Sequence, residues 1–450
     1  MAHQQTEKLA KEPVGRLFLK LAIPGVAAQL VMLVNNIVDR IWVGHIDGCG
    51  ALALTAVGIC MPILLAFLSL AMMVGSGASP RMSIFLGKQD REGAERTLGT
   101  SLWFILVASV ASMVVIYAFT DELILLFGGS SQSMPYARSY LLTSGWGVLF
   151  QFLSIGLTPM LYAQGLVKKG MQYTMIAMSL NIILDPVFIF ALNLGVMGAA
   201  LATNISMIVS TLLIVARLAD RTCSANIRLK FVRLMPKFLM PCLILGLSSC
   251  AALVCESLAL MLYNQSLVRL DGDVAVGAMA VFNIILSTDT MIMLGLSIGA
   301  QPIISYNYGA GENARVRQVL SLTLWTSLAV SVLVWLLVML FPAGTMSLFT
   351  DDASFVAYGS SYVHVFFALA MLIGVNQAVQ YNLRALDKAI PSLMLGLFRR
   401  IILLIPLIWL LPRLMPEHPV TAIYATAPAV EVLTLLPSLF FHFKMRKQFS

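Results

Sequence analysis

The sequence predicts an all-α polytopic membrane protein with twelve transmembrane helices in two six-helix bundles. Three observations lead to this fold class. The 450 residues are 59% hydrophobic and 11% charged, whereas an average soluble domain has about 25% charged residues. Apolar runs long enough to cross a hydrocarbon core recur along the whole chain. Finally, motifs of the first half reappear in the second half.

Each expected span is a predominantly apolar run that reaches across the bilayer as one helix. The spans are expected at 17–42, 54–80, 99–119, 139–163, 171–193, 197–218, 238–262, 274–300, 319–341, 357–383, 394–412 and 421–442. The connecting segments are short. Nearly all of the function is therefore expected to lie inside the membrane.

Basic residues predict the orientation of this topology. Of the 29 lysines and arginines, 25 fall on one side, and the other side has only Arg40, Arg138, Arg269 and Arg413. Because cytoplasmic loops carry the excess of basic residues, both termini are expected in the cytoplasm. Orientation and contact with lipid headgroups account for the net charge of +8. A nucleic-acid partner is not expected.

An internal repeat relates the two halves. The pattern Gly-Ala-x-Pro-x-x-Ser-x-x-x-Gly occurs at 77–87 and again at 299–309, an offset of 222 residues. Pro24 and Asp39 have the same spacing as Pro241 and Glu256. These matches predict two copies of one six-helix arrangement.

The longest basic connection separates the two copies. We therefore expect an N-terminal bundle at 1–218, a cytoplasmic linker at 219–237 and a C-terminal bundle at 238–450. Because each copy has an even number of helices, both enter the membrane from the same side. Such copies are related by a pseudo-two-fold axis along the membrane normal.

The first span carries a polar stripe that ends in an acid. Asn36, Met32 and Gln29 lie three, seven and ten residues before Asp39, which places them on one helix face. Pro24 removes a backbone donor and predicts a bend in the same helix. An ionisable group inside a span usually marks an ion or substrate pathway.

The fifth span repeats this pattern, and the sixth adds polar groups at a similar depth. These residues predict a cation-coupling site that either binds a small cation or shares a proton between two carboxyls; its members are Asp39, Asp185, Asn36, Asn181 and Thr203. Flexible thioethers and an amide near the same faces predict a substrate cavity, formed by Gln29, Met32, Met178 and Met207.

The second half has intramembrane acids of its own. Glu256, Asp289 and Glu431 form a candidate second site, although no residue there matches Asp185. The lysines and arginines are expected in loops or at helix ends, so these carboxylates are expected to lack a basic partner. Each would then be protonated, bound to an ion, or exposed to a water-filled cavity.

These motifs resemble the multidrug and toxic compound extrusion (MATE) family. The resemblance rests on Pro24, on Asn36-x-x-Asp39-x-x-x-x-Gly44-His45, on the glycine-rich ends of the second and eighth spans, and on Asn181-x-x-x-Asp185-Pro186. It implies export of amphipathic cationic drugs in exchange for H⁺ or Na⁺ through a cleft between the bundles, by a monomer in the bacterial inner membrane. It also implies that Asp39, Asp185, Asn181 and Thr203 form the coupling site.

Other function classes fit the sequence less well. A lipid or lipid-linked oligosaccharide flippase of related architecture is the alternative, and it would need basic residues in mid-span. A channel would need a filter motif, and an enzyme would need a nucleophile, a base or metal ligands brought together. We therefore expect no enzymatic activity, no cofactor besides the coupling ion, and no metal site beyond Na⁺ at the coupling acids.

Overall fold

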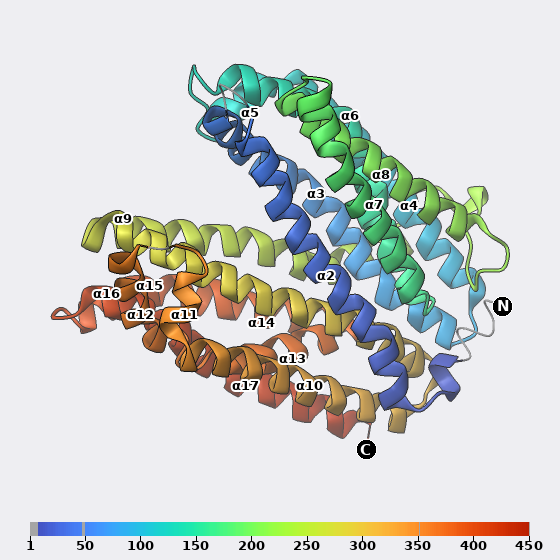
Figure 1. The fold of residues 1–450 in the computed structure, drawn as a ribbon. Coiled ribbons are helices and arrows are strands. Elements are labelled where there is room, and N and C mark those ends of the chain that lie inside the picture. Colours follow the sequence, from blue (N-terminus) through green and yellow to red (C-terminus); the bar gives the residue numbers. More distant parts are fainter. Residues whose placement is uncertain (1–7, 47–49, 351, 450) are drawn as a thin grey trace. The chain divides into compact units, whose positions relative to one another are not determined.

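The structure is a computed structural model that describes residues 8–46, 50–350 and 352–449. Within these ranges the chain forms helices and loops and no β-strand (Figure 1). Eleven helices are long and apolar enough to cross a membrane, and a bent pair of helices makes a twelfth span. The predicted all-α fold class with twelve transmembrane helices is confirmed.

The chain divides into two compact units, which are described separately. Unit 1 is formed mainly by Ile23–Gly246 with Ser305–Gly311, and unit 2 by Pro13–Ala22, Leu247–Ile304 and Glu312–Ser450. Helices α2 and α9 contribute residues to both units. The segment 219–237, which we expected to be a linker, belongs to unit 1.

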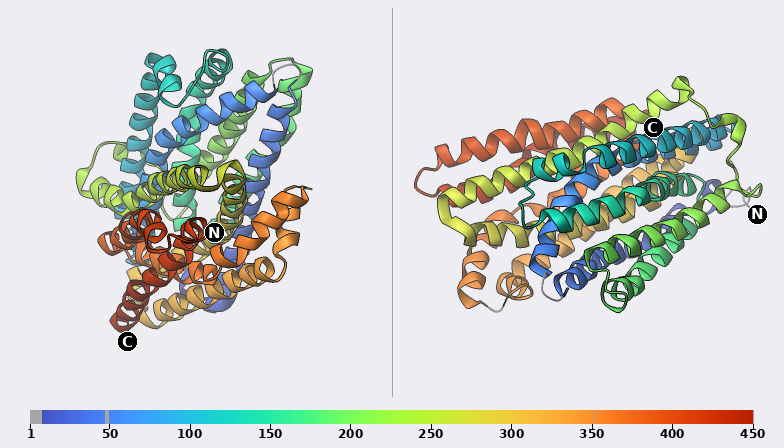
Figure 2. Two further views of the ribbon diagram at one scale, coloured as in Figure 1. Left: turned by 90° about the vertical axis from the view of Figure 1, so that its left-hand side faces the viewer. Right: turned by 90° about the horizontal axis from the view of Figure 1, so that it is seen from above.

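Unit 1 is a helical bundle in which α6 occupies a central place. It packs against α3, α4 and α8, and α7 packs against α8, and Figure 2 shows these helices from two further sides. Its elements are α2 (Val14–Gly44), α3 (Gly50–Gly87), α4 (Arg91–Ala118), α5 (Thr120–Leu126), α6 (Met134–Ala163), α7 (Val167–Pro186), the π-helical turn η1 (Val187–Ala191), α8 (Val196–Ala219), η2 (Leu229–Phe231) and the first part of α9 (Pro236–Ala310).

Unit 2 contains the middle part of α9, Leu247–Ile304, and the helices that follow α9. Helix α9 is two spans, Pro236–Gly272 and Val274–Ala310, separated where Gly272 adopts a φ of 72°. The later elements are α10 (Asn313–Leu340), α11 (Pro342–Ser347), α12 (Ala353–Phe366), η3 (Ala370–Leu372), α13 (Ile373–Ala385), α14 (Ala389–Leu397), the π-helical segment η4 (Phe398–Leu404), α15 (Ile405–Leu414), α16 (Pro419–Tyr424) and α17 (Thr426–Gln448).

The tenth span is not a continuous helix, contrary to the expectation for 357–383. It consists of Ala353–Phe366 and Ala370–Ala385, which are bent by 54° at the break between them. Part of the second segment packs very closely on α10: a Cβ on Gly374 would lie 2.4 Å from the carbonyl oxygen of Ser327. After the break, α13 therefore packs closely against α10.

The repeated glycine motif has the same structural role in both halves. A Cβ on Gly77 would lie 1.9 Å from the carbonyl oxygen of Cys242, and a Cβ on Gly299 would lie 2.5 Å from the amide nitrogen of Ala22. Cys242 follows Ala22 by 220 residues, which is close to the offset of the repeat. Each glycine thus permits contact between two helix backbones at matching places.

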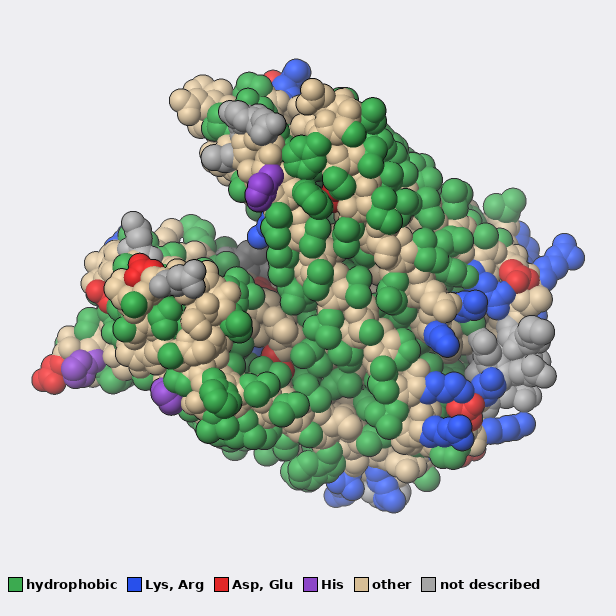
Figure 3. Space-filling model, viewed as in Figure 1, with side chains coloured by type: hydrophobic (Ala, Val, Ile, Leu, Met, Phe, Trp, Pro, Cys, Tyr) green, Lys and Arg blue, Asp and Glu red, His purple; other side chains and the backbone are tan. Residues whose placement is uncertain are grey.

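The surface reflects the sorting of residues that a membrane requires. Figure 3 shows hydrophobic side chains over the long helices, and lysines and arginines gathered where the helices of unit 1 end. There the basic segment after α8 is anchored by ion pairs: Glu95 is 1% exposed and pairs with Arg91 at 2.9 Å and Arg228 at 2.8 Å. The ion pair of Arg228 with Glu95 therefore joins the segment after α8 to α4.

Candidate functional site

The first functional region is a pair of acids in unit 1. Asp39 of α2 and Asp185 of α7 lie close enough for their carboxyl groups to interact with each other. Asp185 is fully buried and Asp39 is partly buried. Among the described residues, neither carboxyl forms an ion pair with a lysine or arginine. Two such close carboxylates repel each other unless they share a proton or a bound cation.

A short chain of amides and a hydroxyl connects this pair to α8. Asn181 lies one turn before Asp185 and donates from Nδ2 to its Oδ1 at 3.1 Å. The same nitrogen lies 3.4 Å from Oγ1 of Thr203. Asn35 donates to Oδ1 of Asn181 at 3.0 Å. Helices α2, α7 and α8 are thus joined through polar groups around the two acids.

Several oxygens at this site lack a hydrogen-bond partner. Oδ1 of Asp39, Oδ2 of Asp185 and Oδ1 of Asn35 are all buried and unpaired. Buried polar atoms are nearly always satisfied, so unpaired acceptors indicate a missing partner. Carboxylate and amide oxygens are ligands for hard cations, and a carboxyl pair also holds a proton. The residues present fit either H⁺ or Na⁺.

The structure corrects one predicted member of this cluster. Asn36 is exposed, and its Nδ2 donates to the carbonyl oxygen of Met32 in its own helix at 2.9 Å. The neighbouring Asn35 takes its place. A spacing of four residues between Asn35 and Asp39 already indicated one shared face, but the stripe through Asn36 looked equally regular in the sequence.

A tyrosine of α6 was not predicted from the sequence. Tyr140 is 5% exposed, and its phenol is close enough to Asp39 and Asp185 to interact electrostatically with both. No motif signals this residue, because only the packing of α6 between distant helices brings it here.

The residues predicted to line a substrate cavity lie in unit 1. Gln29 and Met178 are buried, and Met32 and Met207 are partly buried. Pro24 lies inside α2, which continues through it as one helix. The part of α2 before Ile23 belongs to unit 2. Pro24 therefore lies next to the boundary between the two units within α2.

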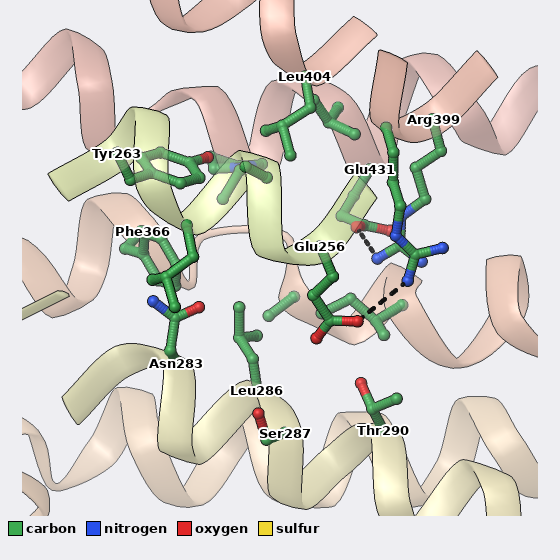
Figure 4. Close-up of a pocket in the computed structure, with 18 of the residues that line it drawn as sticks. Glu256, Tyr263, Asn283, Leu286, Ser287, Thr290, Phe366, Arg399, Leu404 and Glu431 are labelled. Carbon is green, nitrogen blue, oxygen red and sulfur yellow. Dashed lines mark hydrogen bonds and ion pairs between the residues drawn. The ribbon is translucent and has the colours of Figure 1, made fainter. Parts of the chain in front are cut away.

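The second functional region is a cavity of about 200 Å³ inside unit 2 (Figure 4). Tyr263 and Phe366 lie at one end of it, and Arg399, Glu431 and Glu256 lie at the other. Met279, Leu286 and Leu404 add apolar lining, and Asn283, Ser287 and Thr290 add amide and hydroxyl groups. The cavity therefore has an aromatic end and a charged end.

The charged end contradicts our expectation that lysines and arginines lie only in loops or at helix ends. Arg399 and Arg400 are residues 11 and 12 of the 26-residue span Ala389–Leu414. Arg399 is paired with Glu431 through Nη2, and Arg400 lies 3.6 Å from Glu256. The sequence pattern misled us because this helix begins several residues before the apolar run that marked it.

The three acids of the candidate second site have different surroundings. Glu431 accepts from Nδ2 of Asn376 at 2.8 Å in addition to Arg399, whereas Glu256 is exposed. Asp289 accepts from Ser331 at 3.0 Å and lines a separate, smaller cavity. They do not form one set of converging oxygens like that around Asp39. A cation site in unit 2 stays a prediction.

Comparison with known proteins identifies the family of this fold. Residues 24–187 and 249–410 match the MatE family model. A protein of Shewanella oneidensis named "FAD transporter" is 26% identical over 89% of this chain and 88% of its own length. The "Multidrug export protein MepA" of Staphylococcus aureus is 21% identical over 84% of this chain and 82% of its own.

Solved structures share the architecture over the full length. One described as the outward-facing conformation of a multidrug resistance MATE family transporter of the MOP superfamily has a TM-score of 0.90, with 20% identity and 98% of each chain covered. The family model covers both halves, in agreement with the internal repeat. The chain belongs to the MatE family of membrane transporters.

Proposed function

We propose that this protein is a secondary active transporter that exports amphipathic small molecules in exchange for H⁺ or Na⁺. The observation that carries the proposal is the acid pair Asp39 and Asp185, which lies among unpaired oxygens and without a basic partner in the described chain. Such a site gains or loses a cation with little rearrangement of its ligands. The positive-inside pattern supports cytoplasmic termini, and we propose that the protein acts as a monomer in the bacterial inner membrane.

Cation loading at the acid pair offers a physical route to coupling. Loading neutralises buried charge and so changes the preferred packing of α2 beyond Pro24. Substrate that prefers the empty form is then released when the ion binds. Linkage requires reciprocity: substrate must weaken cation binding by the same factor by which cation weakens substrate binding.

The cargo has two candidate classes. The family resemblance and the relative named "Multidrug export protein MepA" support amphipathic cationic drugs. The relative named "FAD transporter" supports an anionic amphipathic cargo, because FAD carries a diphosphate. The argument from sequence against phosphate-bearing cargo no longer holds, since basic residues do lie in mid-span. The same basic residues also support the alternative function, a lipid or lipid-linked oligosaccharide flippase.

The test is transport into proteoliposomes that contain the purified chain. A fluorescent amphipathic cation and FAD are each supplied with an imposed pH gradient, an imposed sodium gradient or neither. We expect one gradient to drive accumulation of one cargo in the wild type and to fail with Asp39→Asn. Movement that is equal with and without gradients, and equal in the variant, would rule out coupled transport at this site.

A further inference from the structure

The arginine-lined cavity of unit 2 suggests a ligand chemistry that the acid pair of unit 1 does not. We infer that this cavity binds the anionic group of an amphipathic substrate, with Arg399 and Arg400 as the anion-binding residues. This inference rests on the proposed transport function, because it names the substrate class of the same protein. It assigns no ion-coupling role to unit 2.

The first support is an unused hydrogen-bond donor. Nη2 of Arg399 is engaged by Glu431, but its Nη1 is buried and has no partner. A guanidinium group offers five N–H donors in a fixed fork that matches carboxylate and phosphate oxygens. A buried donor of this kind without an acceptor is costly. An anion in the cavity would supply that acceptor.

The second support is the weak pairing of Arg400. Its side chain is 13% exposed, whereas the side chain of its partner Glu256 is 58% exposed. Their nitrogen and oxygen are 3.6 Å apart, which is too long for a direct hydrogen bond. Among the described residues this is the only ion pair of Arg400. An incoming anion can therefore displace Glu256 without breaking a close contact.

The third support is the shape and position of the cavity. The two arginines are the second and third residues of the π-helical segment η4, and π-helical segments are frequent at functional sites. The opposite end is formed by Tyr263 and Phe366, and Leu286 adds apolar lining between the two ends. An apolar body would pack against this end while its anionic group reaches the guanidinium groups. The lining thus selects an amphipathic anion over a simple inorganic ion.

Other charged groups lie around the two arginines. Arg384 is a third guanidinium nearby, held over the ring of Tyr381 at 4.6 Å and bonded to Ser249. Asp289 accepts a hydrogen bond from Ser331 and lines the separate, smaller cavity. Glu431 is tied to Arg399 and Asn376. These groups have close partners, so Arg399 Nη1 and Arg400 remain as the sites for a new acceptor.

The test is equilibrium binding to the purified full chain in detergent, without any ion gradient. The probes are 1-naphthyl phosphate and a naphthylethyl trimethylammonium salt, which share a ring system and differ in the sign of charge. We expect the phosphate to bind more tightly. Arg400→Gln should weaken phosphate binding about tenfold and leave the ammonium probe unaffected, and Arg400→Lys should recover part of the loss.

Two further variants separate binding from structure. Arg413→Gln removes an exposed basic residue of the same span and should change neither probe. Glu256→Gln removes the competing carboxylate and should tighten phosphate binding, whereas a cation site at Glu256 would instead weaken ammonium or sodium binding. The thermal stability of each variant is measured as well. If Arg400→Gln proves to be misfolded, the phosphate binding of Glu256→Gln decides the test.

The inference is overturned if the ammonium probe binds more tightly, or if phosphate binding is the same in wild type, Arg400→Gln and Glu256→Gln. It stands independently of coupling: arginine-dependent phosphate binding without gradient-driven transport would refute the proposed function and keep the anion site. Conversely, gradient-driven export of the ammonium probe with no effect of Arg400→Gln would keep the transporter and refute the anion site.

Discussion

The two halves of this protein use one helical arrangement for opposite charges. The fifth span of unit 1 carries Asn181 and Asp185, and neither Asp185 nor the nearby Asp39 forms an ion pair in the described chain. The corresponding span of unit 2 carries Arg399 and Arg400, which face Glu431 and Glu256. Both spans contain a π-helical segment, η1 after Asp185 and η4 at the arginines.

The difference shows how a repeated fold acquires two kinds of site. A helix bundle that buries polar groups in mid-membrane must satisfy or neutralise them. Unit 1 does so with the side-chain amides of Asn35 and Asn181 and without an ion-paired base, and we propose that a cation completes this site. Unit 2 does so with guanidinium groups, and we propose that an anion binds to them. The corresponding spans of the two halves thus carry charged groups of opposite sign, Asp185 in the first half and Arg399 and Arg400 in the second.

The largest difference between the two halves is expected when the repeat-related acids Asp39 and Glu256 are neutralised separately. Asp39→Asn should reduce gradient-driven export to the level of empty liposomes, because it removes one of two carboxyls that hold the coupling ion. Glu256→Gln, at the matching position of the second half, should leave gradient coupling intact. Export is measured at equal protein density in proteoliposomes. Full export by Asp39→Asn would disprove the coupling role.

The acid pair should also behave as one unit. Asp39→Asn, Asp185→Asn and the double variant should lose nearly the same amount of coupled export, since either change leaves one carboxyl that cannot share a proton or chelate a cation. Double-mutant analysis of initial rates tests this expectation. Losses that add up would mean that the two carboxyls act at independent sites.

In unit 2 the corresponding change should affect stability. Glu431→Gln leaves the buried Arg399 without its partner, and breaking a buried pair of this kind costs about 3–5 kcal/mol. We expect a lower unfolding temperature in detergent. The double change Arg399→Gln with Glu431→Gln should recover most of the loss. If Glu431→Gln is as stable as the wild type, the ion pair of Arg399 with Glu431 does not contribute to stability.

The smallest expected effect distinguishes two adjacent amides. Asn35→Ala removes the hydrogen bond to Asn181 that is 3.0 Å long, which should cost about 1 kcal/mol and lower the apparent affinity for the coupling ion about fivefold. Asn36→Ala is the matched control, because Asn36 is exposed and bonds only within its own helix. Equal effects of the two changes would place the ion elsewhere on α2.

The acids of unit 1 were accessible to sequence reasoning because each lies on a regular helical stripe. Asp39 and Asp185 stood out as carboxylates inside apolar spans, and a polar residue one turn before each indicated its face. That reasoning fails where two adjacent residues both fit a stripe, as Asn35 and Asn36 do. Only the packing of α2 against α7 separates them.

The sequence by itself determined the number of spans, the repeat and the intramembrane acids, because these depend on local composition and spacing along single helices. The tertiary structure decided which groups meet: Tyr140 beside the acid pair, the bend between α12 and α13, and above all Arg399 and Arg400 facing Glu431 and Glu256. The depth of a charged side chain in the membrane depends on where its helix begins, and its partner depends on which helices pack against it. The local sequence pattern specifies neither.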